Sequence, residues 1–160
     1  MTDKVYSLAL LLRGDEILLA MKKRGFGAGK WNGAGGKVEP GETIEQAVIR
    51  ECQEELTVTP IKFHKVAYHD FILTADTDKP WHQWAYVFIV TDWEGEPTET
   101  EEMAPSWFKL DAIPYGQMWD DDIHWLPSVL AGKLLNTTFT FDSKEHMMDK
   151  NIREVTKFND

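Results

Sequence analysis

The sequence contains one cysteine, Cys52, among 160 residues. A lone cysteine cannot form a disulfide within the chain, so it fits a reducing, cytoplasmic setting in which Cys52 is a small packed side chain. Long hydrophobic runs are also missing, and runs such as 8–12 are far too short to span a bilayer. The first residues show no basic segment followed by an apolar stretch and a cleavage site. These absences predict a soluble protein.

Basic residues are scarce as well. The chain has 17 Lys and Arg against 27 Asp and Glu, which gives a net charge of −10. A surface that binds duplex nucleic acid needs the opposite balance, so we expect no nucleic-acid partner. A small phosphorylated ligand remains compatible with this charge, because bound cations invert the local field. The length predicts a single domain, residues 1–160, large enough to bury about 70% of its unfolded surface.

The most informative stretch is 35–56, which begins as a glycine-rich loop and continues as a helix. On a helical wheel, Glu51 and Glu55 fall in the middle of the apolar arc, and Glu54 falls at its edge. The apolar members of that arc are Ile44, Ala47, Val48 and Cys52. Buried carboxylates need positive partners, and hard divalent cations bind oxygen ligands. The alternative is a solvated acidic helix end, which glutamate runs often form.

The spacing of this stretch resembles the signature of the Nudix (MutT-like) hydrolases. Gly36 is followed after five residues by Glu42 and after seven more by the run 50–55, and every charged position of the pattern is filled. Thr57 replaces the glycine that usually ends the helix. The resemblance implies an α+β fold, an α/β/α sandwich with a mixed sheet between helices. It also implies Mg²⁺, with Mn²⁺ possible, held by the Gly36 carbonyl and by Glu51, Glu54, Glu55 and Glu102, with Arg50 positioning a glutamate.

The segment 22–37 before the helix is rich in glycine and carries five of the basic residues. Glycines let a backbone approach a ligand closely and expose its N–H groups, and the local positive charge suits a polyphosphate. A flexible linker is the alternative for any glycine-rich loop. The residues that we expect to contact substrate here are Lys22, Phe26, Asn32, Gly35, Gly36 and Lys37.

Hydrophobic patterns predict two helices and six or seven strands. We expect strands at 5–12, 16–22, 61–73, 84–90, 107–110 and 137–141, with a further strand within 151–158. The continuous apolar character of the first two strands predicts that both of their faces are covered. The helices are expected at 44–56 and 120–133, the second with an aspartate N-cap. The acidic segment 91–105 is expected to be a loop.

Beyond the signature, segments 22–33 and 107–122 resemble the oxidised purine nucleoside triphosphatases within the Nudix family. Carried over by position, the resemblance implies a base pocket formed by Ser7, Lys22, Asn32, Phe71, Trp119, Asp121 and Asp122. Their chemistry agrees, because carboxylates accept hydrogen bonds from purine N–H groups and an indole face stacks on a base. One aspartate of the pair could be held protonated by its neighbour and so read two different purines. The alternative role for the aspartates is helix capping.

The resemblance therefore implies Mg²⁺-dependent hydrolysis of oxidised purine nucleoside triphosphates, such as 8-oxo-dGTP and 2-hydroxy-dATP, to the monophosphate and pyrophosphate by a monomer that sanitises the nucleotide pool. An alternative is a Nudix pyrophosphatase acting on another nucleotide, such as ADP-ribose. A non-catalytic binding module is a third reading, although it would be expected to lose the signature acids. The sequence does not rank oxidised against alkylated purines.

Overall fold

The computed structural model describes residues 4–25, 27–73, 78 and 80–158. Within these ranges the chain forms one nine-stranded sheet, two α-helices and a short 3₁₀ helix, η1. The helices are α1 Ile44–Leu56, η1 Tyr115–Gln117 and α2 Asp122–Leu130. The strands are β1 Lys4–Arg13, β2 Glu16–Lys22, β3 Trp31–Asn32, β4 Ala34–Lys37, β5 Thr59–Leu73, β6 Trp81–Glu94, β7 Met103–Lys109, β8 Leu134–Phe141 and β9 Met147–Val155.

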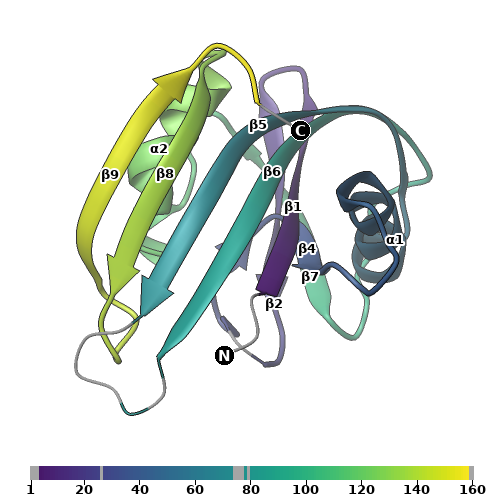
Figure 1. The fold of residues 1–160 in the computed structure, drawn as a ribbon. Coiled ribbons are helices and arrows are strands. Elements are labelled where there is room, and N and C mark those ends of the chain that lie inside the picture. Colours follow the sequence, from purple (N-terminus) through teal and green to yellow (C-terminus); the bar gives the residue numbers. More distant parts are fainter. Residues whose placement is uncertain (1–3, 26, 74–77, 79, 159–160) are drawn as a thin grey trace.

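The sheet is mixed, as the sequence predicted. Its strand order is β3-β2-β1-β6-β5-β8-β9, with β4 paired to β1 and β7 paired to β2. The pairs β1–β6 and β5–β8 are parallel, and the other pairs are antiparallel. In Figure 1, α1 and α2 lie toward opposite sides of the molecule, α2 beside β8 and β9 and α1 beyond β1.

Two apolar cores lie on the two faces of the sheet. Successive residues of β2 alternate between them: Ile17 and Leu19 join the core that contains the apolar residues of α2, and Leu18 and Ala20 join the core that contains those of α1. Side chains alternate in this way because successive residues of a strand point to opposite faces. The expectation that the first strands are covered on both faces is confirmed.

An opening between β1 and β2 shapes the site. The two strands pair only near their turn, from Leu11 opposite Leu18 to Arg13 opposite Glu16. Beyond that they diverge, and β3 pairs with β2 while β4 pairs with β1. The sequence predicted one long loop over 22–37. The structure has two short strands there, which the glycine content concealed because glycine carries little strand propensity.

Several other bounds differ from the prediction. The longest extension is β6, which runs from Trp81 to Glu94 and so includes the start of the expected acidic loop. Its polar residues interrupt the apolar pattern, but backbone pairing with β5 continues past them. The helix α2 is shorter than expected and continues through Pro127. In the connection between the expected strands 61–73 and 84–90, residues 74–77 and 79 lie outside the described residues.

The ends of α1 are well defined. Thr43 is the N-cap, since its Oγ1 accepts from the backbone N–H of Gln46 and the Gln46 side chain accepts from the N–H of Thr43. This reciprocal pair satisfies two donors that the first turn leaves without partners. At the other end, Thr57 has φ 62° and so adopts the left-handed conformation itself. The missing glycine therefore does not change the helix exit.

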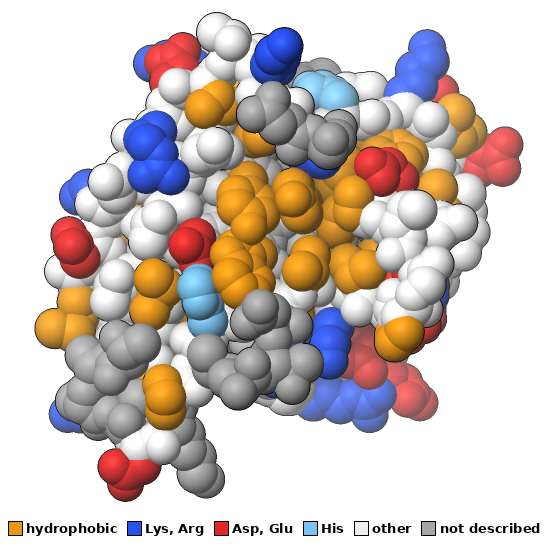
Figure 2. Space-filling model, in the orientation of Figure 1, with side chains coloured by type: hydrophobic (Ala, Val, Ile, Leu, Met, Phe, Trp, Pro, Cys, Tyr) orange, Lys and Arg blue, Asp and Glu red, His pale blue; other side chains and the backbone are white. Residues whose placement is uncertain are grey.

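The helix α1 covers only part of its face of the sheet. Figure 2 shows hydrophobic side chains exposed in the middle of the face on view. Aromatic pairs on β5 and β6 include Tyr68 with Tyr86 and His82 with Trp84, whose ring centroids lie 4.7 and 4.2 Å apart.

Neither helix of the described chain has the length and apolar character needed to cross a membrane.

Candidate active site

The acids of α1 lie as the helical wheel predicted. Glu55 is buried, with 7% of its surface exposed, and the side chain of Glu51 is 12% exposed. The side chain of Glu54, at the edge of the arc, is 58% exposed. Glu51 and Glu55 are one turn apart and face β4, so the helix directs two carboxylates at the glycine strand.

Arg50 holds the acids of this helix in place. Its guanidinium donates to Glu51 Oε1 at 2.7 Å and to Glu54 Oε2 at 3.2 Å. On its other side it donates to both carboxylate oxygens of Glu42, at 2.7 and 2.9 Å, and lowers the pKa of Glu42 to about 2. On the wheel Arg50 projects about 100° from Glu51, but its long side chain folds back to reach it. The expected positioning role of Arg50 agrees with these contacts, as does a structural role for Glu42.

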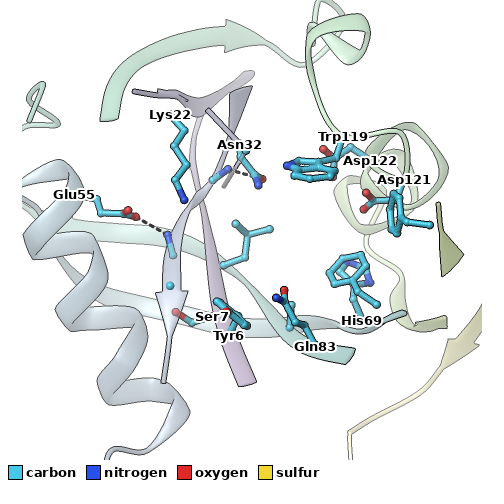
Figure 3. A pocket seen from close by; sticks show the side chains of 18 of the residues that line it. Tyr6, Ser7, Lys22, Asn32, Glu55, His69, Gln83, Trp119, Asp121 and Asp122 are labelled. Atoms are coloured by element: carbon cyan, nitrogen blue, oxygen red, sulfur yellow. Dashed lines mark hydrogen bonds between the residues drawn. The ribbon is translucent and has the colours of Figure 1, made fainter. Parts of the chain in front are cut away.

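Glu55 is bound to β4 through a backbone amide. The N–H of Gly35 donates to Glu55 Oε1 at 2.7 Å (Figure 3). Burial raises the pKa of Glu55 to about 7, and burial also raises that of Glu51. A Cβ on Gly36 would lie 2.5 Å from Glu51 Oε1, and one on Gly35 would lie 1.9 Å from the backbone oxygen of Ser7. A Cβ at position 35 would therefore meet fixed backbone, whereas one at position 36 would meet the carboxylate of Glu51, which can move.

Glu102 reaches the same cleft from the segment before β7. Its carboxylate accepts from Arg24 at 2.6 Å, and its negative charge contributes to the raised pKa of Glu55. The side chain of Glu101 is 90% exposed and that of Glu102 is 40% exposed, so Glu102 is the more enclosed of the two. An acidic cleft results, lined by Lys22, Arg24, Gly36, Lys37, Glu51, Glu54, Glu55, Glu101 and Glu102 among others.

The donors of the acidic cleft fit a hard divalent cation, because they are carboxylate and carbonyl oxygens. Burial raises the pKa of Glu51 and of Glu55, and a cation bound between them would favour their charged forms. Among the described residues, no three acidic, histidine or cysteine side chains are grouped so that they could hold a metal ion by themselves. An open cleft of this kind suits Mg²⁺, which keeps several waters and takes one or two carboxylates together with substrate phosphates.

A second cavity, of about 200 Å³, adjoins the cleft. The two share Tyr6, Lys22, Gly35, Gly36 and Glu55 in their walls, so the opening between β1 and β2 connects them. Figure 3 shows Asn32, Trp119 and the two aspartates around this cavity, with Glu55 at its other end. The predicted residues that line it are Ser7, Lys22, Asn32, Gly35, Gly36, Phe71, Trp119, Asp121 and Asp122. An apolar chamber with a few polar groups, joined to an acidic cleft, suits a flat base attached to a phosphate chain.

Asp121 and Asp122 are both buried in the wall of this cavity. Asp121 Oδ2 accepts from the indole N–H of Trp125 at 2.8 Å. Burial raises the pKa of Asp121 to about 6, and burial together with the neighbouring charge of Asp121 raises that of Asp122 further. Asp121 is the N-cap residue of α2, but its side chain makes no capping bond. An aspartate therefore occupies the N-cap position as predicted, but its carboxylate accepts from Trp125 and does not cap the helix.

Asn32 and Trp119 are also fixed by their neighbours. The N–H of Gly33 donates to Asn32 Oδ1 at 2.9 Å, which orients the amide. Lys30 Nζ lies 5.2 Å from the centre of the Trp119 ring, and the Trp119 and Phe141 rings meet edge to face. Of the remaining predicted contacts, Lys37 lines the acidic cleft rather than the cavity. Phe26 lies outside the described residues.

The sequence did not predict several residues of the cavity wall. They come chiefly from the strands and include Tyr6, Leu8, His69, Trp81, Gln83, Ala85, Met103 and Phe141. Strand alternation could have found some of them, because His69 lies two residues before Phe71 and so on the same face. The pairing of β5 with β6, which places Phe71 opposite Gln83, could not be read from local sequence.

A buried glutamate helix beside a glycine strand, joined to a base-sized chamber, suits metal-assisted hydrolysis of a phosphate anhydride. The NUDIX domain matches residues 3–129, and the chain belongs to the NUDIX family of hydrolases. Nudix hydrolases generally use a divalent metal.

Similar proteins cover nearly the whole chain. It is 44% identical over 154 residues to the oxidized purine nucleoside triphosphate hydrolase of Danio rerio, which covers 96% of this chain and 97% of that protein. The protein of the same name from Mus musculus is 41% identical over 157 residues, with 98% and 99% covered. A crystal structure of a MutT protein from Bacillus halodurans has a TM-score of 0.84, covers 93% of this chain and 97% of its own, and is 24% identical. That structure supports the fold, which agrees with the predicted α+β sandwich.

Proposed function

We propose that this Nudix hydrolase uses Mg²⁺ to hydrolyse oxidised purine nucleoside triphosphates to the monophosphate and pyrophosphate. Water adds to a phosphorus of the triphosphate, and the phosphoanhydride bond to the pyrophosphate group breaks. Removing such nucleotides keeps the nucleotide pool free of damaged purines. The observation that carries the proposal is the connection of the chamber containing Asn32, Asp121 and Asp122 with the glutamate cleft. The names of the two relatives that match over nearly the full chain support the substrate class.

The chamber recognises the base in this proposal. Asn32 and the aspartate pair offer donors and acceptors for a purine edge, and the protonated member of the pair can donate. The face of Trp119 supplies a surface on which the base stacks, a contact worth about 1–3 kcal/mol in comparable sites. Lys22 borders both the chamber and the cleft, so its ammonium group lies where a phosphate chain leaves the base.

The cleft holds the phosphates. Glu51, Glu54 and Glu55, the Gly36 carbonyl and Glu102 would hold Mg²⁺, or Mn²⁺ in its place. A bound divalent cation neutralises phosphate charge and lowers the pKa of water. Arg50 keeps Glu51 and Glu54 in position through its hydrogen bonds. Lys37 and Arg24 place further positive charge beside the phosphates.

The test is a specificity comparison over oxidised, methylated and unmodified purine triphosphates with Mg²⁺, in which pyrophosphate and phosphate release are measured separately. We expect the highest kcat/KM with an oxidised purine triphosphate and release of pyrophosphate. A preference for ADP-ribose or for a dinucleoside polyphosphate would replace this proposal with the alternative Nudix substrate class. Tight binding of a nucleotide without turnover would indicate a binding module.

We further propose that the protein acts as a monomer in the cytoplasm on free nucleotides. The net charge of −10 is unfavourable for nucleic-acid binding. Sedimentation at micromolar concentration tests the monomer directly.

A further inference from the structure

His69 is a fully buried polar residue in the wall of the chamber. It lies on β5, and none of its surface is exposed. Its Nδ1 forms a hydrogen bond of 2.6 Å with Thr137 Oγ1 on the neighbouring strand β8. Its Nε2 has no hydrogen-bond partner among the residues that the structure describes. Nδ1 therefore has a partner within the chain, whereas Nε2 is buried without one.

Aromatic rings fix the orientation of this imidazole. The ring centroids of Trp125, Phe71 and Phe139 lie 4.4, 5.4 and 5.6 Å from that of His69. An apolar side chain would pack among these rings without leaving a nitrogen unpaired. Because a buried polar atom without a partner costs folding free energy, the arrangement is unfavourable for stability alone. A hydrogen bond to a bound ligand would recover that cost.

The imidazole is neutral, and its Nε2 can be either a hydrogen-bond donor or a hydrogen-bond acceptor. Burial lowers the pKa of His69 to about 3, so the ring carries one proton near neutral pH. The hydroxyl of Thr137 can donate to Nδ1 or accept from it. In the first case Nε2 carries a hydrogen and donates, and in the second case Nε2 accepts. A carboxylate in the place of Thr137 would favour only the second tautomer.

The position of His69 suits contact with the base rather than with the phosphates. His69 borders the chamber but not the acidic cleft. In Figure 3, His69 and Gln83 lie on the side of the chamber away from Lys22 and Asn32. Its neighbour in the chamber wall is Phe71, one of the predicted base contacts, and Asp121 and Asp122 line the same chamber.

We propose that His69 is a specificity-determining residue whose Nε2 hydrogen bonds to the purine base of the bound nucleotide, with Thr137 orienting the ring. This inference rests on the proposed function, because it assumes that the chamber holds a purine. The aspartates and Asn32 then hydrogen bond to one part of the base edge, and His69 hydrogen bonds to another. Because the tautomer follows the ligand, His69 can pair with a carbonyl oxygen or with a ring nitrogen that lacks hydrogen when it donates, and with an amino group when it accepts.

The decisive variant is the double substitution His69→Leu with Thr137→Val, which replaces the pair by apolar groups and leaves no unpaired hydroxyl. We expect it to fold with a melting temperature at or above that of the wild type. Its kcat/KM for the preferred purine triphosphate should fall about tenfold or more relative to the unmodified purine, mainly through KM, because a site built to hydrogen-bond a group discriminates through that bond. Thr137→Ser keeps the hydroxyl and should retain the wild-type ratio. His64→Asn, an exposed histidine on the same strand, is the matched control.

A second measurement does not depend on turnover. In protein labelled with ¹⁵N-histidine, the Nε2 resonance of His69 should shift when the purine monophosphate product binds, and it should be absent from the double variant. An unchanged resonance, or a folded double variant that retains the wild-type selectivity, would overturn the role of His69. If the wild type prefers a purine substrate other than the oxidised ones, the proposed function fails separately, and the same comparison made with that substrate still decides the role of His69.

Discussion

At the scale of single residues, the two glutamates of α1 that face β4 differ in what compensates their charge. Glu51 accepts from the guanidinium of Arg50, whereas the contact found for Glu55 is the backbone N–H of Gly35. Burial raises the pKa of Glu55 to about 7, and the hydrogen bond from the Gly35 amide offsets only part of this rise. Glu55 is therefore the acid that gains most from a cation in the cleft.

Glu55→Gln should lower kcat by orders of magnitude and leave the affinity for the purine monophosphate product within a few fold of the wild type. The amide removes a cation ligand from the cleft but leaves the base contacts in the chamber. Steady-state kinetics and calorimetric titration measure the two effects. Glu45→Gln, an exposed position on the same helix, is the control. Near-normal turnover of Glu55→Gln would contradict the proposed metal site.

The buried aspartates predict a pH dependence of stability. Because the folded-state pKa of Asp122 is raised above its unfolded value, the folded chain binds more protons, and stability falls as pH rises from about 4 toward that folded pKa. Asp122→Asn removes this dependence.

Between pH 5 and 8, the free energy of unfolding of Asp122→Asn should therefore fall less steeply than that of the wild type. The two slopes should differ by about 1.4 kcal/mol per pH unit up to the folded pKa. Urea denaturation at several pH values measures the difference, and Asp111→Asn, an exposed aspartate, serves as the control. Parallel pH profiles would show that Asp122 is ionised in the folded protein.

At the scale of elements, α1 was predictable and β4 was not. The turn at 40–41, the cap Thr43 and the apolar spacing are local signals, and they gave the start of α1 at Ile44 and its end at Leu56. The strand β4 exists because β1 lies beside it, with Ser7 opposite Gly36. A pairing between segments about 30 residues apart leaves no mark in the composition of either.

The two glycines of β4 should fail in different ways when replaced by alanine. Gly35→Ala places a Cβ against the fixed backbone of Ser7, so it should weaken the β1–β4 pairing and lower the melting temperature. Gly36→Ala meets a side chain, the carboxylate of Glu51, which can rotate away. We therefore expect Gly36→Ala to fold but to lose most of its turnover.

Thermal unfolding and kcat distinguish these two outcomes. Gly116→Ala provides the control, because a Cβ at that position would meet no atom within 4 Å. Equal losses of stability in the Gly35 and Gly36 variants would contradict the different origins of the two contacts.

The chamber, like β4, could be predicted only in part, because strand pairing is not visible in the local sequence. Asn32, Trp119 and the aspartates could be predicted because they lie in segments that resemble a known group of enzymes. Tyr6 and Gln83 could not, because they reach the chamber through the pairing of β1, β6 and β5. The resemblance therefore predicted chamber residues on the sheet, such as Ser7 and Phe71, as well as those near α2, and the wall residues that it missed are ones that strand pairing brings to the chamber.

At the scale of the whole molecule, the sheet carries two cores and the site lies where the sheet opens. Alternate residues of β2 contribute to both cores, so the faces are not independent. The acidic cleft lies beside α1, and the chamber contains Asp122 at the first turn of α2. A ligand that fills both would contact elements from both sides of the sheet.

Mg²⁺ should raise the melting temperature of the whole protein by mass action, because only the folded chain assembles the cleft. At a hundred times the dissociation constant the expected gain is about 2.7 kcal/mol. Scanning calorimetry with and without chelator measures it. The gain should be smaller in Glu51→Gln and unchanged in Glu45→Gln. Equal stabilisation of all three proteins would place the cation elsewhere.

The shared wall of Gly35 and Gly36 has one more consequence. Because β4 is paired with β1, with Ser7 opposite Gly36, the backbone between the chamber and the cleft is held in place along its length. A nucleotide anchored by its base must therefore present the same bond of its phosphate chain to the glutamates each time. We therefore expect the enzyme to distinguish diphosphates from triphosphates by the length of the phosphate chain alone.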